Sequence, residues 1–530
     1  MPISVSIKAN LYKDSVALMR IGQIVLAREG VQRATLLMGT PANKAILASS
    51  GLFASELEAA RPGDVMISVD AETDDLVAAA IAEIASQLEG EVKQTAGEVE
   101  SIPLRSIAMG RARSAEAALV QISVPGMYAA AEAMKAVRQG MHVFLFSDNV
   151  PLEQERAVKA LARKKGVLVM GPDCGTAIIR GVPLGFANVV RSGSIGLVGA
   201  SGTGLQEVTC QIHALGQGIR HAIGTGGRDV YAEIGGSTMR QAIALLAADS
   251  QTRVIGIVSK PPAPEVARQI FDELAAIDKP SVVLFLGADL SAQKLPPHIV
   301  AVTTLFDAAA AAVALAEGKR FVRATQSEES ARTAQSEARR LAPGQRHLRG
   351  LYSGGTFCTE AQLVWRDLGL RVQSNAPVDK GAASEGTARS TGHAAIDLGD
   401  DEFTVGRPHP MIDPSARIDR IAQEAADPST AAIVLDVVLG YAGHEDPAGV
   451  LAPAITAAKA TAAKAGRHLP VVTFVCGTED DPQRLSAQQA KLREAGALVL
   501  PNSTAAARLA GAIAEQAALL AEQGSLEQVK

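Results

Sequence analysis

Short apolar runs, each followed by a segment with helical periodicity, recur along almost the whole chain. Runs of this kind, rich in Val, Ile and Leu, are typical of strands buried on both faces, and their alternation with helices predicts βαβ units and a parallel sheet. In the first third of the chain the runs are ATLLMG (34–39), DVMISVD (64–70), ALVQISV (118–124), HVFLFS (142–147) and VLVMGP (167–172).

Interruptions of this alternation divide the chain into blocks. The pattern stops over 88–113, which we interpret as an exposed insertion into a first domain covering 1–190. A second domain covers 191–318, and a third covers 346–530. Polar and charged residues over 319–345 indicate a linker between them.

Composition favours several domains built on helix-flanked sheets. At 530 residues the chain is too long for one hydrophobic core, and aromatic residues make up only 3% of it, so Ala, Val, Leu and Ile must fill the interior. The formal charge of −5 gives no reason to expect nucleic acid or a membrane as partner, and no apolar run reaches membrane-spanning length. The sequence opens without a signal-peptide pattern, and its four cysteines lack metal-ligand spacing, so we expect a cytoplasmic protein with no metal site.

The segment SIGLVGASGTGLQE (194–207) predicts a strand that ends in glycines and turns directly into a helix. The first N–H groups of such a helix are unpaired, and the helix dipole adds positive charge there, so the turn can hold a phosphate or carboxylate. The alternative is a tight strand–helix connection without a ligand. No Lys-Ser/Thr pair follows the glycines, which excludes a P-loop. The predicted phosphate-binding residues are Ser201, Gly202, Thr203 and Gly204.

Polar side chains are densest between 397 and 413. There Arg407 and His409 lie on a proline-stiffened loop, where a guanidinium could clamp a small planar anion and an imidazole could donate a proton. The alternative is an exposed loop whose arginine pairs with a neighbouring acid. The acids of this cluster are Asp397, Asp400, Asp401, Glu402 and Asp413.

Other residues at predicted strand ends are further candidates. Lys260, in the turn VSKPP, could add a positive charge to the site, although a lysine at a sheet edge is often a solvated surface residue. Arg228 and Asp229 could line the same crevice or form a local ion pair. A second strand–glycine–helix turn, LYSGGTFCTEA, gives a second candidate anion site that packing alone explains equally well. Its residues are Ser353, Gly354, Gly355 and Thr356, together with Gly440.

The middle of the chain resembles the α subunit of succinyl-CoA synthetase. Phe146-Ser147-Asp148-Asn149-Val150-Pro151 stands in the place of a segment that contacts CoA in that family, and Gly171-Pro172-Asp173-Cys174 is similar to its Gly-Pro-Asn-Cys loop. The third block is similar to the C-terminal domain of the β subunit. The resemblance implies an α/β protein with a Rossmann-like CoA-binding-type domain followed by two flavodoxin-like domains, and a CoA or nucleotide site at Phe146, Ser147, Asp148, Gly171 and Pro172.

The departures from that family are equally informative. Only the linker separates the second and third blocks, so the resemblance implies no ATP-grasp domain. His298 lacks the Gly-His-Ala-Gly setting of the phosphorylated histidine, and Ser259-Lys260-Pro261-Pro262 replaces the Gly-Glu-Ile-Gly that orients it. The N-terminus lacks the Thr-Gly-x-x-Gly turn that seats the CoA diphosphate. Phosphohistidine relay and use of ATP by this chain alone are therefore not expected.

Long strings such as MGTPANKAIL (38–47), VMGPDCGT (169–176) and IDLGDDEFTVGRPHPMIDP (396–414) resemble the FdrA family. This resemblance implies a cytoplasmic subunit of a multi-protein carbamoyltransferase that moves a carbamoyl group between phosphate and oxamate in purine or allantoin breakdown, with further subunits or copies as partners. Arg407, His409 and Lys260 are then the candidate catalytic residues. The alternatives are an acyl-CoA synthetase subunit, for which CoA is the one cofactor implied, and a non-catalytic scaffold or regulatory subunit.

Overall fold

The computed structural model describes residues 3–528 except 12, 14, 27, 94–103, 292, 324–326, 384–388 and 405–407. Within these residues the chain forms two compact units: unit 1 comprises Met1–Arg113 with Thr404–Pro408, and unit 2 comprises Ser114–Phe403 with His409–Lys530. Among the helices described, none combines the length and the apolar character that crossing a bilayer requires.

Unit 1 contains a three-stranded antiparallel sheet in the order β1-β3-β2, where β3 pairs with both neighbours. The prediction of a parallel sheet is therefore wrong for this part of the chain, because the central strand β3 runs opposite to both of its neighbours. The predicted insertion over 88–113 includes the end of α3 and all of α4, while 94–103 lie outside the described residues. The elements are β1 (Ile3–Lys8), α1 (Ser15–Leu26), β2 (Val31–Met38), α2 (Pro41–Ser49), a 3-10 turn (Ser55–Ala59), β3 (Val65–Ala71), α3 (Asp74–Lys93) and α4 (Ile107–Arg113).

Unit 2 begins with a small parallel sheet in the order β4-β5-β6. The chain thus divides at Arg113, inside the stretch 1–190 for which the sequence predicts one domain. Only the second half of that stretch has the parallel βαβ arrangement. Its elements are β4 (Leu119–Ile122), α5 (Gly126–Arg138), β5 (His142–Leu145), α6 (Leu152–Lys165) and β6 (Val169–Met170).

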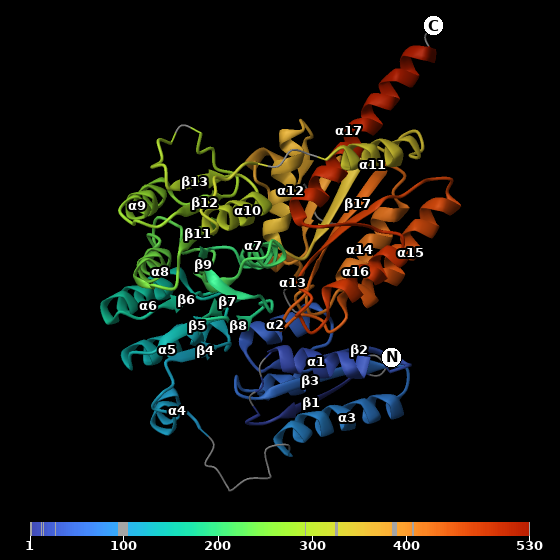
Figure 1. The fold of residues 1–530 in the computed structure, drawn as a ribbon. Coiled ribbons are helices and arrows are strands. Elements are labelled where there is room, and N and C mark those ends of the chain that lie inside the picture. The colour runs from blue at the N-terminus through green and yellow to red at the C-terminus, as the bar shows by residue number, and fades with distance from the viewer. Residues whose placement is uncertain are drawn as a thin grey trace. The chain divides into compact units, whose positions relative to one another are not determined.

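The second block and the strands β7 and β8, which precede residue 191 and lie within the predicted first domain, together form a seven-stranded sheet in the order β13-β12-β11-β9-β10-β7-β8 (Figure 1). The first five of these strands are parallel, and the β7–β8 hairpin extends the sheet antiparallel to β10. The elements are β7 (Thr176–Ile179), β8 (Val182–Gly185), β9 (Ser192–Gly199), α7 (Gly202–Ala214), β10 (Ile219–Gly224), α8 (Ser237–Ala248), β11 (Val254–Ser259), α9 (Pro264–Ala275), β12 (Ser281–Phe285), β13 (Ile299–Val302) and α10 (Leu305–Ala316).

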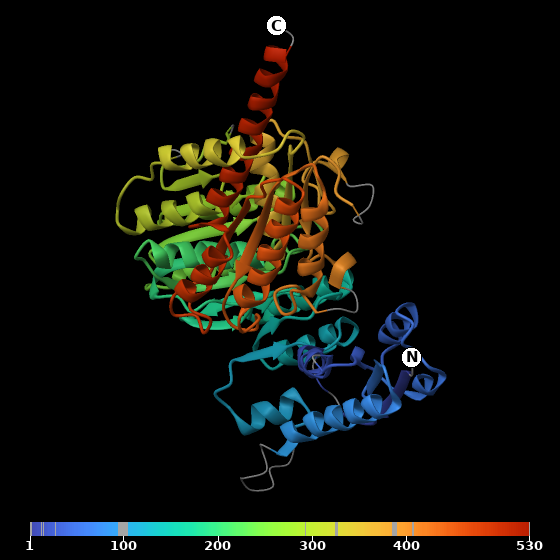
Figure 2. The same ribbon diagram turned by 90° about the vertical axis from the view of Figure 1, so that its right-hand side faces the viewer.

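The third block forms a six-stranded parallel sheet in the order β15-β16-β14-β17-β18-β19. Its last helix, α17, packs on the sheet with its first half and projects beyond it with its second (Figures 1 and 2). The elements are β14 (His347–Tyr352), α12 (Gly355–Asp367), β15 (Val372–Gln373), a 3-10 turn (Lys380–Ala382), β16 (His393–Asp397), α13 (Asp401–Thr404), α14 (Ser415–Ala426), β17 (Thr430–Val438), α15 (Pro447–Lys464), β18 (Val471–Cys476), α16 (Leu485–Glu494), β19 (Leu498–Leu500) and α17 (Ser503–Gln528).

The predicted linker over 319–345 contains a helix, α11 (Glu328–Arg339), that packs against α17. Ala334 and Ala338 are buried at one-turn spacing on its inner face, while most of the other residues of the helix are polar or charged. Small apolar residues in a charged segment leave almost no hydrophobic pattern, which is why the sequence indicates a linker here.

The second and third blocks repeat one topology. Strands β9 and β14 each begin a block and lie inside their sheets. The orders β13-β12-β11-β9-β10 and β19-β18-β17-β14-β16 correspond by position, and the short β15 is an additional strand at the edge beside β16. The helices that follow these first strands, α7 and α12, contact each other and lie side by side (Figure 1). The α/β class with parallel sheets is confirmed for both blocks, and their repetition brings two equivalent helix starts together.

Candidate functional site

The predicted turn after β9 is formed as expected. Ser201 is extended and caps α7, because its hydroxyl accepts a hydrogen bond from the N–H of Gly204 at 3.1 Å. Gly202 is exposed and Thr203 is half-buried, so solvent reaches this helix start. We call residues 201–204 the first elbow.

The equivalent turn after β14, residues 353–356, is the second elbow. Here the buried carboxylate of Asp436 on β17 accepts hydrogen bonds from the N–H groups of Ser353 and Gly354, at 2.9 and 3.0 Å, and from the Ser353 hydroxyl at 2.7 Å. Arg417 donates to the same carboxylate at 2.9 Å and balances its charge. An acid of the protein therefore occupies half of the second predicted anion site. The amide of Gly440, also assigned to that site, donates to Gln483 at 3.0 Å instead.

The two elbows meet. The hydroxyls of Ser201 and Thr356 lie 2.6 Å apart, and a Cβ on Gly354 would come within 3.0 Å of the Thr203 side chain. Each helix start thus faces the other directly. Within the described part of the chain no partner bonds the N–H groups of Gly202 and Thr203 or those of Gly355 and Thr356. Four amide donors from two helix starts are therefore available on one small patch.

Asp397 and His409 lie beside the second elbow. Asp397 ends β16, and a Cβ on Gly355 would come within 2.6 Å of its Oδ2. Burial, followed by repulsion from the nearby Asp400 and Asp436, raises the pKa of Asp397 to about 7. A Cβ on Gly399 would lie within 2.7 Å of His409 Nε2 and 3.2 Å of Asp397 Oδ1. The side chains of His409 and Asp397 therefore both lie close to the backbone of Gly399.

His409 is a neutral side chain. Burial lowers its pKa to about 4, and its Nδ1 accepts a hydrogen bond from the N–H of Met411 at 3.3 Å, which assigns the proton to Nε2. Its ring packs against Phe186, whose ring in turn packs against Phe146, with centroids 5.9 and 5.7 Å apart. This aromatic chain links His409 to the predicted CoA segment. Arg407, its predicted catalytic companion, lies outside the described residues.

The loops predicted to contact CoA lie together at the carboxyl ends of β5 and β6. The N–H of Asp173 donates to the carbonyl of Ser147 at 2.9 Å, and the Ser147 hydroxyl is itself bonded to the carbonyl of Val124. Gly171 has a φ of +110°, and a Cβ there would come within 2.2 Å of the Leu145 carbonyl, so only glycine fits beside Pro172.

This edge is acidic. Both Asp148 and Asp173 reach solvent. Desolvation by the surrounding protein, followed by repulsion from neighbouring acids that include Asp401, raises both pKa values, that of Asp173 to about 6. Lys260 contributes positive charge near Asp173, and its Nζ lies 3.4 Å from the Tyr231 hydroxyl and over the Tyr231 ring. The structure thus brings Lys260 to the acidic loops rather than to an elbow.

Arg228 and Asp229 do not pair with each other. Arg228 binds Glu155 of α6 at 2.9 Å, and Asp229 binds Lys159 of the same helix at 2.8 Å. Cys174 is buried, and burial raises its thiol pKa to about 12, as expected for a structural cysteine. His298 bonds the carbonyl of Leu274 near the amino ends of β12 and β13, away from the elbows.

Two buried glutamates, Glu207 and Glu360, cap helices of the opposite block. The resemblance to the α subunit of succinyl-CoA synthetase includes Glu207 beside the first elbow, whereas the sequence does not indicate Glu360 or the capping role of either glutamate. Glu207 on α7 accepts a hydrogen bond from the N–H of Ser503, the first residue of α17, at 3.1 Å. Glu360 on α12 accepts one from the N–H of Leu305, the first residue of α10, at 2.8 Å. Each helix thus caps the last helix of the other block. The repeated spacing Gly-Thr-x-x-x-Glu at 202–207 and 355–360 was the available signal.

A protein of Escherichia coli strain K12, the uncharacterized protein YahF, is 42% identical to this chain over 95% of the chain and 97% of its own length. The CoA-ligase family matches residues 351–513, and the CoA binding domain family matches 190–287. The chain belongs to the succinyl-CoA synthetase-like family. The CoA-binding match falls on the second block, whereas the resemblance noted in the sequence gave that character to residues 1–190.

More distant relatives are α subunits of succinate–CoA ligases. The mitochondrial subunit alpha-2 of Trichomonas vaginalis is 30% identical over 36% of this chain and 62% of its own length, and the subunit of Aquifex aeolicus is 28% identical over 39% and 68%. The match to a solved ATP citrate lyase from Methanothrix soehngenii covers 79% of this chain and 86% of that protein, with 15% identity and a TM-score of 0.34.

Residues 1–103 match a family described as AllF, heavy metal-associated domain. Soft metal ions prefer thiolate and imidazole ligands, and this stretch contains neither a cysteine nor a histidine. Across the described residues no group of three or more His, Cys, Asp or Glu side chains is placed to hold a metal. Residues 1–103 therefore lack the thiolate and imidazole ligands that the name of this domain implies.

Proposed function

We propose that this chain is the phosphate-binding subunit of an enzyme that transfers an acyl group between phosphate and a second acceptor. The observation that carries this proposal is the pair of elbows, which presents four unpartnered amides from two helix starts. Amides at helix starts bind phosphate, and oriented donors also stabilise the charge that develops when an acyl–phosphate bond forms or breaks.

Membership of the succinyl-CoA synthetase-like family favours CoA as the acceptor. CoA would supply a thiol that takes the acyl group as phosphate leaves. The loops that carry Phe146, Ser147 and Asp148 would hold its uncharged pantetheine arm, since Asp148 and Asp173 make this edge unsuitable for phosphates. No glycine follows β1 before residue 22, so the first strand of the chain offers no amide seat for the CoA diphosphate.

Next to the elbows, His409 and Asp397 have defined tasks in this proposal. The neutral imidazole donates from Nε2 toward the reacting carbonyl oxygen, and Asp397, with its pKa near 7, exchanges a proton with the acceptor. Arg407 would clamp the carboxylate of the acyl substrate, and Lys260 would compensate the acids at the edge of the site. The remaining catalytic groups come from partner subunits, as the subunit names of the relatives suggest.

A second candidate is carbamoyl transfer between phosphate and oxamate, as the FdrA resemblance implies. The match of residues 1–103 to an AllF domain favours it, and so does the lack of a glycine seat for the CoA diphosphate after β1. Carbamoyl phosphate is itself a mixed anhydride of phosphate, so the elbows would play the same role in both reactions. The two candidates differ in the acceptor.

The elbows are tested by removing one amide without disturbing the helix. Gly202 is the first residue of α7, where proline is tolerated, and the extended Ser201 before it suits a following proline. Gly202→Pro therefore deletes one N–H, whereas the control Gly202→Ala keeps it and places a Cβ at an ordinary 3.5 Å from Thr176. Calorimetry should show phosphate binding weakened about tenfold or more by proline and little by alanine. Equal affinities for both variants would refute the phosphate site.

Activity assays of the full chain with its partner subunits identify the acceptor of the acyl group. CoA-dependent breakdown of an acyl phosphate, lost in Gly202→Pro, would support the CoA reaction. Oxamate-dependent release of phosphate from carbamoyl phosphate would support the second candidate and overturn the first. If the partner subunits catalyse either reaction equally well without this chain, the chain is a scaffold and both proposals fail.

A further inference from the structure

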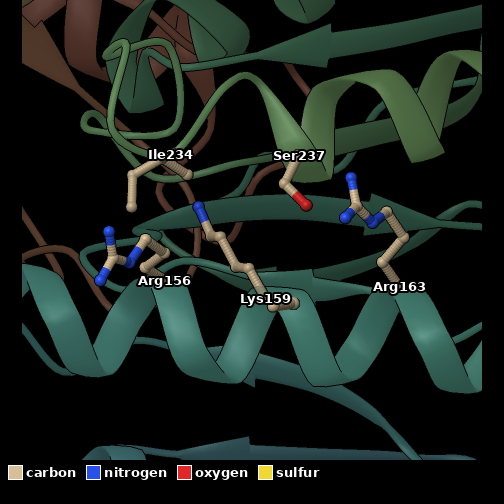
Figure 3. Close-up of a pocket in the computed structure, with 6 residues that line it drawn as sticks. Arg156, Lys159, Arg163, Ile234 and Ser237 are labelled. Atoms are coloured by element: carbon tan, nitrogen blue, oxygen red, sulfur yellow. The ribbon is translucent and has the colours of Figure 1, made fainter.

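A small cavity lies between α6 and the start of α8. Its volume is about 110 Å³, and its lining includes three basic side chains of α6 and the first residue of α8 (Figure 3). A volume of this order holds several water molecules, and therefore also a tetrahedral oxyanion. The lining residues are Arg156, Lys159, Ala160, Arg163, Ile234 and Ser237.

The arginines are available to a ligand. Arg156, Lys159 and Arg163 follow one another at three- and four-residue spacing, so they lie on one face of α6. Arg156 and Arg163 are exposed, and in the described part of the chain neither guanidinium has a hydrogen bond or an ion pair. Two uncompensated positive charges therefore flank the cavity.

The floor of the cavity is rigid and electrically balanced. Lys159 is only 2% exposed, and its Nζ donates to the Thr225 carbonyl at 3.0 Å and to the Asp229 carboxylate at 2.8 Å. The same Nζ forms an ion pair with Glu155 at 2.9 Å. Arg228 compensates the second oxygen of Glu155 at 2.9 Å. Because this network is neutral as a whole, the net charge at the cavity is that of the two arginines.

The start of α8 adds neutral donors. Asp229 accepts the N–H groups of Thr238 and Met239, at 3.0 and 2.9 Å, and so holds the helix start in place. The N–H and the hydroxyl of Ser237 have no partner among the described residues, and its hydroxyl lies on the side of Arg163 in Figure 3. A helix start, a free hydroxyl and two unpaired guanidinium groups thus border one hollow.

We propose that this cavity binds a phosphoryl group, held by Arg156 and Arg163 from α6 and by the Ser237 N–H and hydroxyl from α8. Guanidinium groups match phosphate oxygens in geometry, and two of them match its double negative charge better than that of a carboxylate. The site is separate from the elbows and does not rest on the proposed function. Its phosphoryl group belongs either to free phosphate or to a phosphate monoester such as the 3′-phosphate of CoA.

The test uses the full chain and inorganic phosphate. The double variant R156A/R163A removes both free cations, and the control K164A/K165A removes two exposed cations of the same helix that do not line the cavity. All four side chains are exposed, so both variants should fold. In the Gly202→Pro background, which weakens the elbows, calorimetry should report phosphate binding that R156A/R163A weakens about tenfold or more and K164A/K165A leaves nearly unchanged. Equal weakening by both pairs would reduce the effect to general charge and overturn the site.

Crystals soaked in an anomalous anion locate the bound ion, and a comparison of CoA with dephospho-CoA identifies the molecule that carries the phosphoryl group. Selenate, a tetrahedral dianion with a strong anomalous signal, should give a peak between Arg163 and Ser237 in the parent chain and none in R156A/R163A; its absence from the parent would overturn the site. If the parent binds CoA more tightly than dephospho-CoA, whereas R156A/R163A binds the two with equal affinity, the source is the CoA 3′-phosphate. If phosphate binds but CoA and dephospho-CoA do not differ, the source is free phosphate.

Discussion

The hydroxyls of Ser201 and Thr356 lie 2.6 Å apart, although 155 residues separate them in the sequence. Both belong to helix starts that follow the first strand of a repeated block. Ser201 also accepts the N–H of Gly204, and either hydroxyl of the Ser201–Thr356 pair can act as the donor. The contact fixes how the two elbows face each other, and hence the spacing of the four unpartnered amides.

Thr356→Val should loosen this arrangement while leaving the Ser201 cap of α7 intact. Valine has the shape of threonine but can neither donate nor accept this hydrogen bond, so we expect a loss of about 1 kcal/mol in the free energy of unfolding and weaker phosphate binding. The matched control Thr356→Ser keeps the hydroxyl. Chemical denaturation and phosphate titration of both variants measure the two effects. A valine variant that binds phosphate as tightly as the serine variant would show that the hydroxyl pair does not position the amides.

The capping hydrogen bonds of Glu207 and Glu360 form a second set of contacts between the two blocks. Both carboxylates are fully buried, and burial raises both pKa values, that of Glu207 to about 7. Between pH 4.5, the ordinary value for glutamate, and pH 7, the folded protein therefore binds more protons at Glu207 than the unfolded chain does. Stability contributed by this group is fully present below about pH 4.5 and is lost as the pH rises through 7.

Glu207→Gln should remove that dependence, because glutamine resembles the protonated acid and still accepts the Ser503 N–H. A shift from 4.5 to about 7 corresponds to about 3 kcal/mol, so the variant should be more stable than the parent at pH 8 by an amount of that order and similar to it at pH 4.5. Calorimetric melting at both values checks this. The exposed Glu233→Gln serves as control. A difference between parent and variant that does not change with pH would contradict the raised pKa.

Asp436→Asn should damage the second elbow directly. Its carboxylate holds two amides and a hydroxyl of that turn and compensates the buried Arg417. Breaking a buried pair leaves a charge without compensation, at a cost of about 3–5 kcal/mol. Urea denaturation should show this loss, and the double variant D436N/R417M should recover part of it. A double variant that is no more stable than Asp436→Asn would show that the hydrogen bonds to the turn, not the unbalanced charge, dominate.

The sequence predicts local parts of the site because their signals are local. Ser201 to Gly204 and Ser353 to Thr356 each combine an apolar run, small residues and a helical pattern within about a dozen positions, and both turns have the expected form. Their meeting is not local. An elbow has the same sequence whether it faces solvent or another elbow, so the Ser201–Thr356 contact has no signature of its own.

A charged residue inside an apolar strand is a sequence signal for a buried polar network. Asp436 interrupts the run AAIVLDVVL, and a carboxylate there must find partners when it is buried. Periodicity also fails to give strand direction: the runs at 34–39 and 64–70 resemble those of the parallel sheets, yet β2 and β3 pair antiparallel. The relative direction of two neighbouring strands depends on how the segment that connects them crosses the sheet. The spacing of apolar residues contains no information about that connection.

His409 should remain uncharged throughout the physiological range. Burial lowers its pKa from 6.5 to about 4, so the folded protein binds fewer protons there than the unfolded chain between these values, and the stability it contributes is present above pH 6.5 and lost as the pH falls toward 4. NMR of the labelled imidazole, assigned with His409→Gln, should show a neutral ring with its proton on Nε2 at pH 7. Phe186→Ala removes the ring that covers it and should raise the pKa toward 6.5. A parent midpoint near 6.5 would mean that solvent reaches His409 and that it can act as a cation beside the elbows.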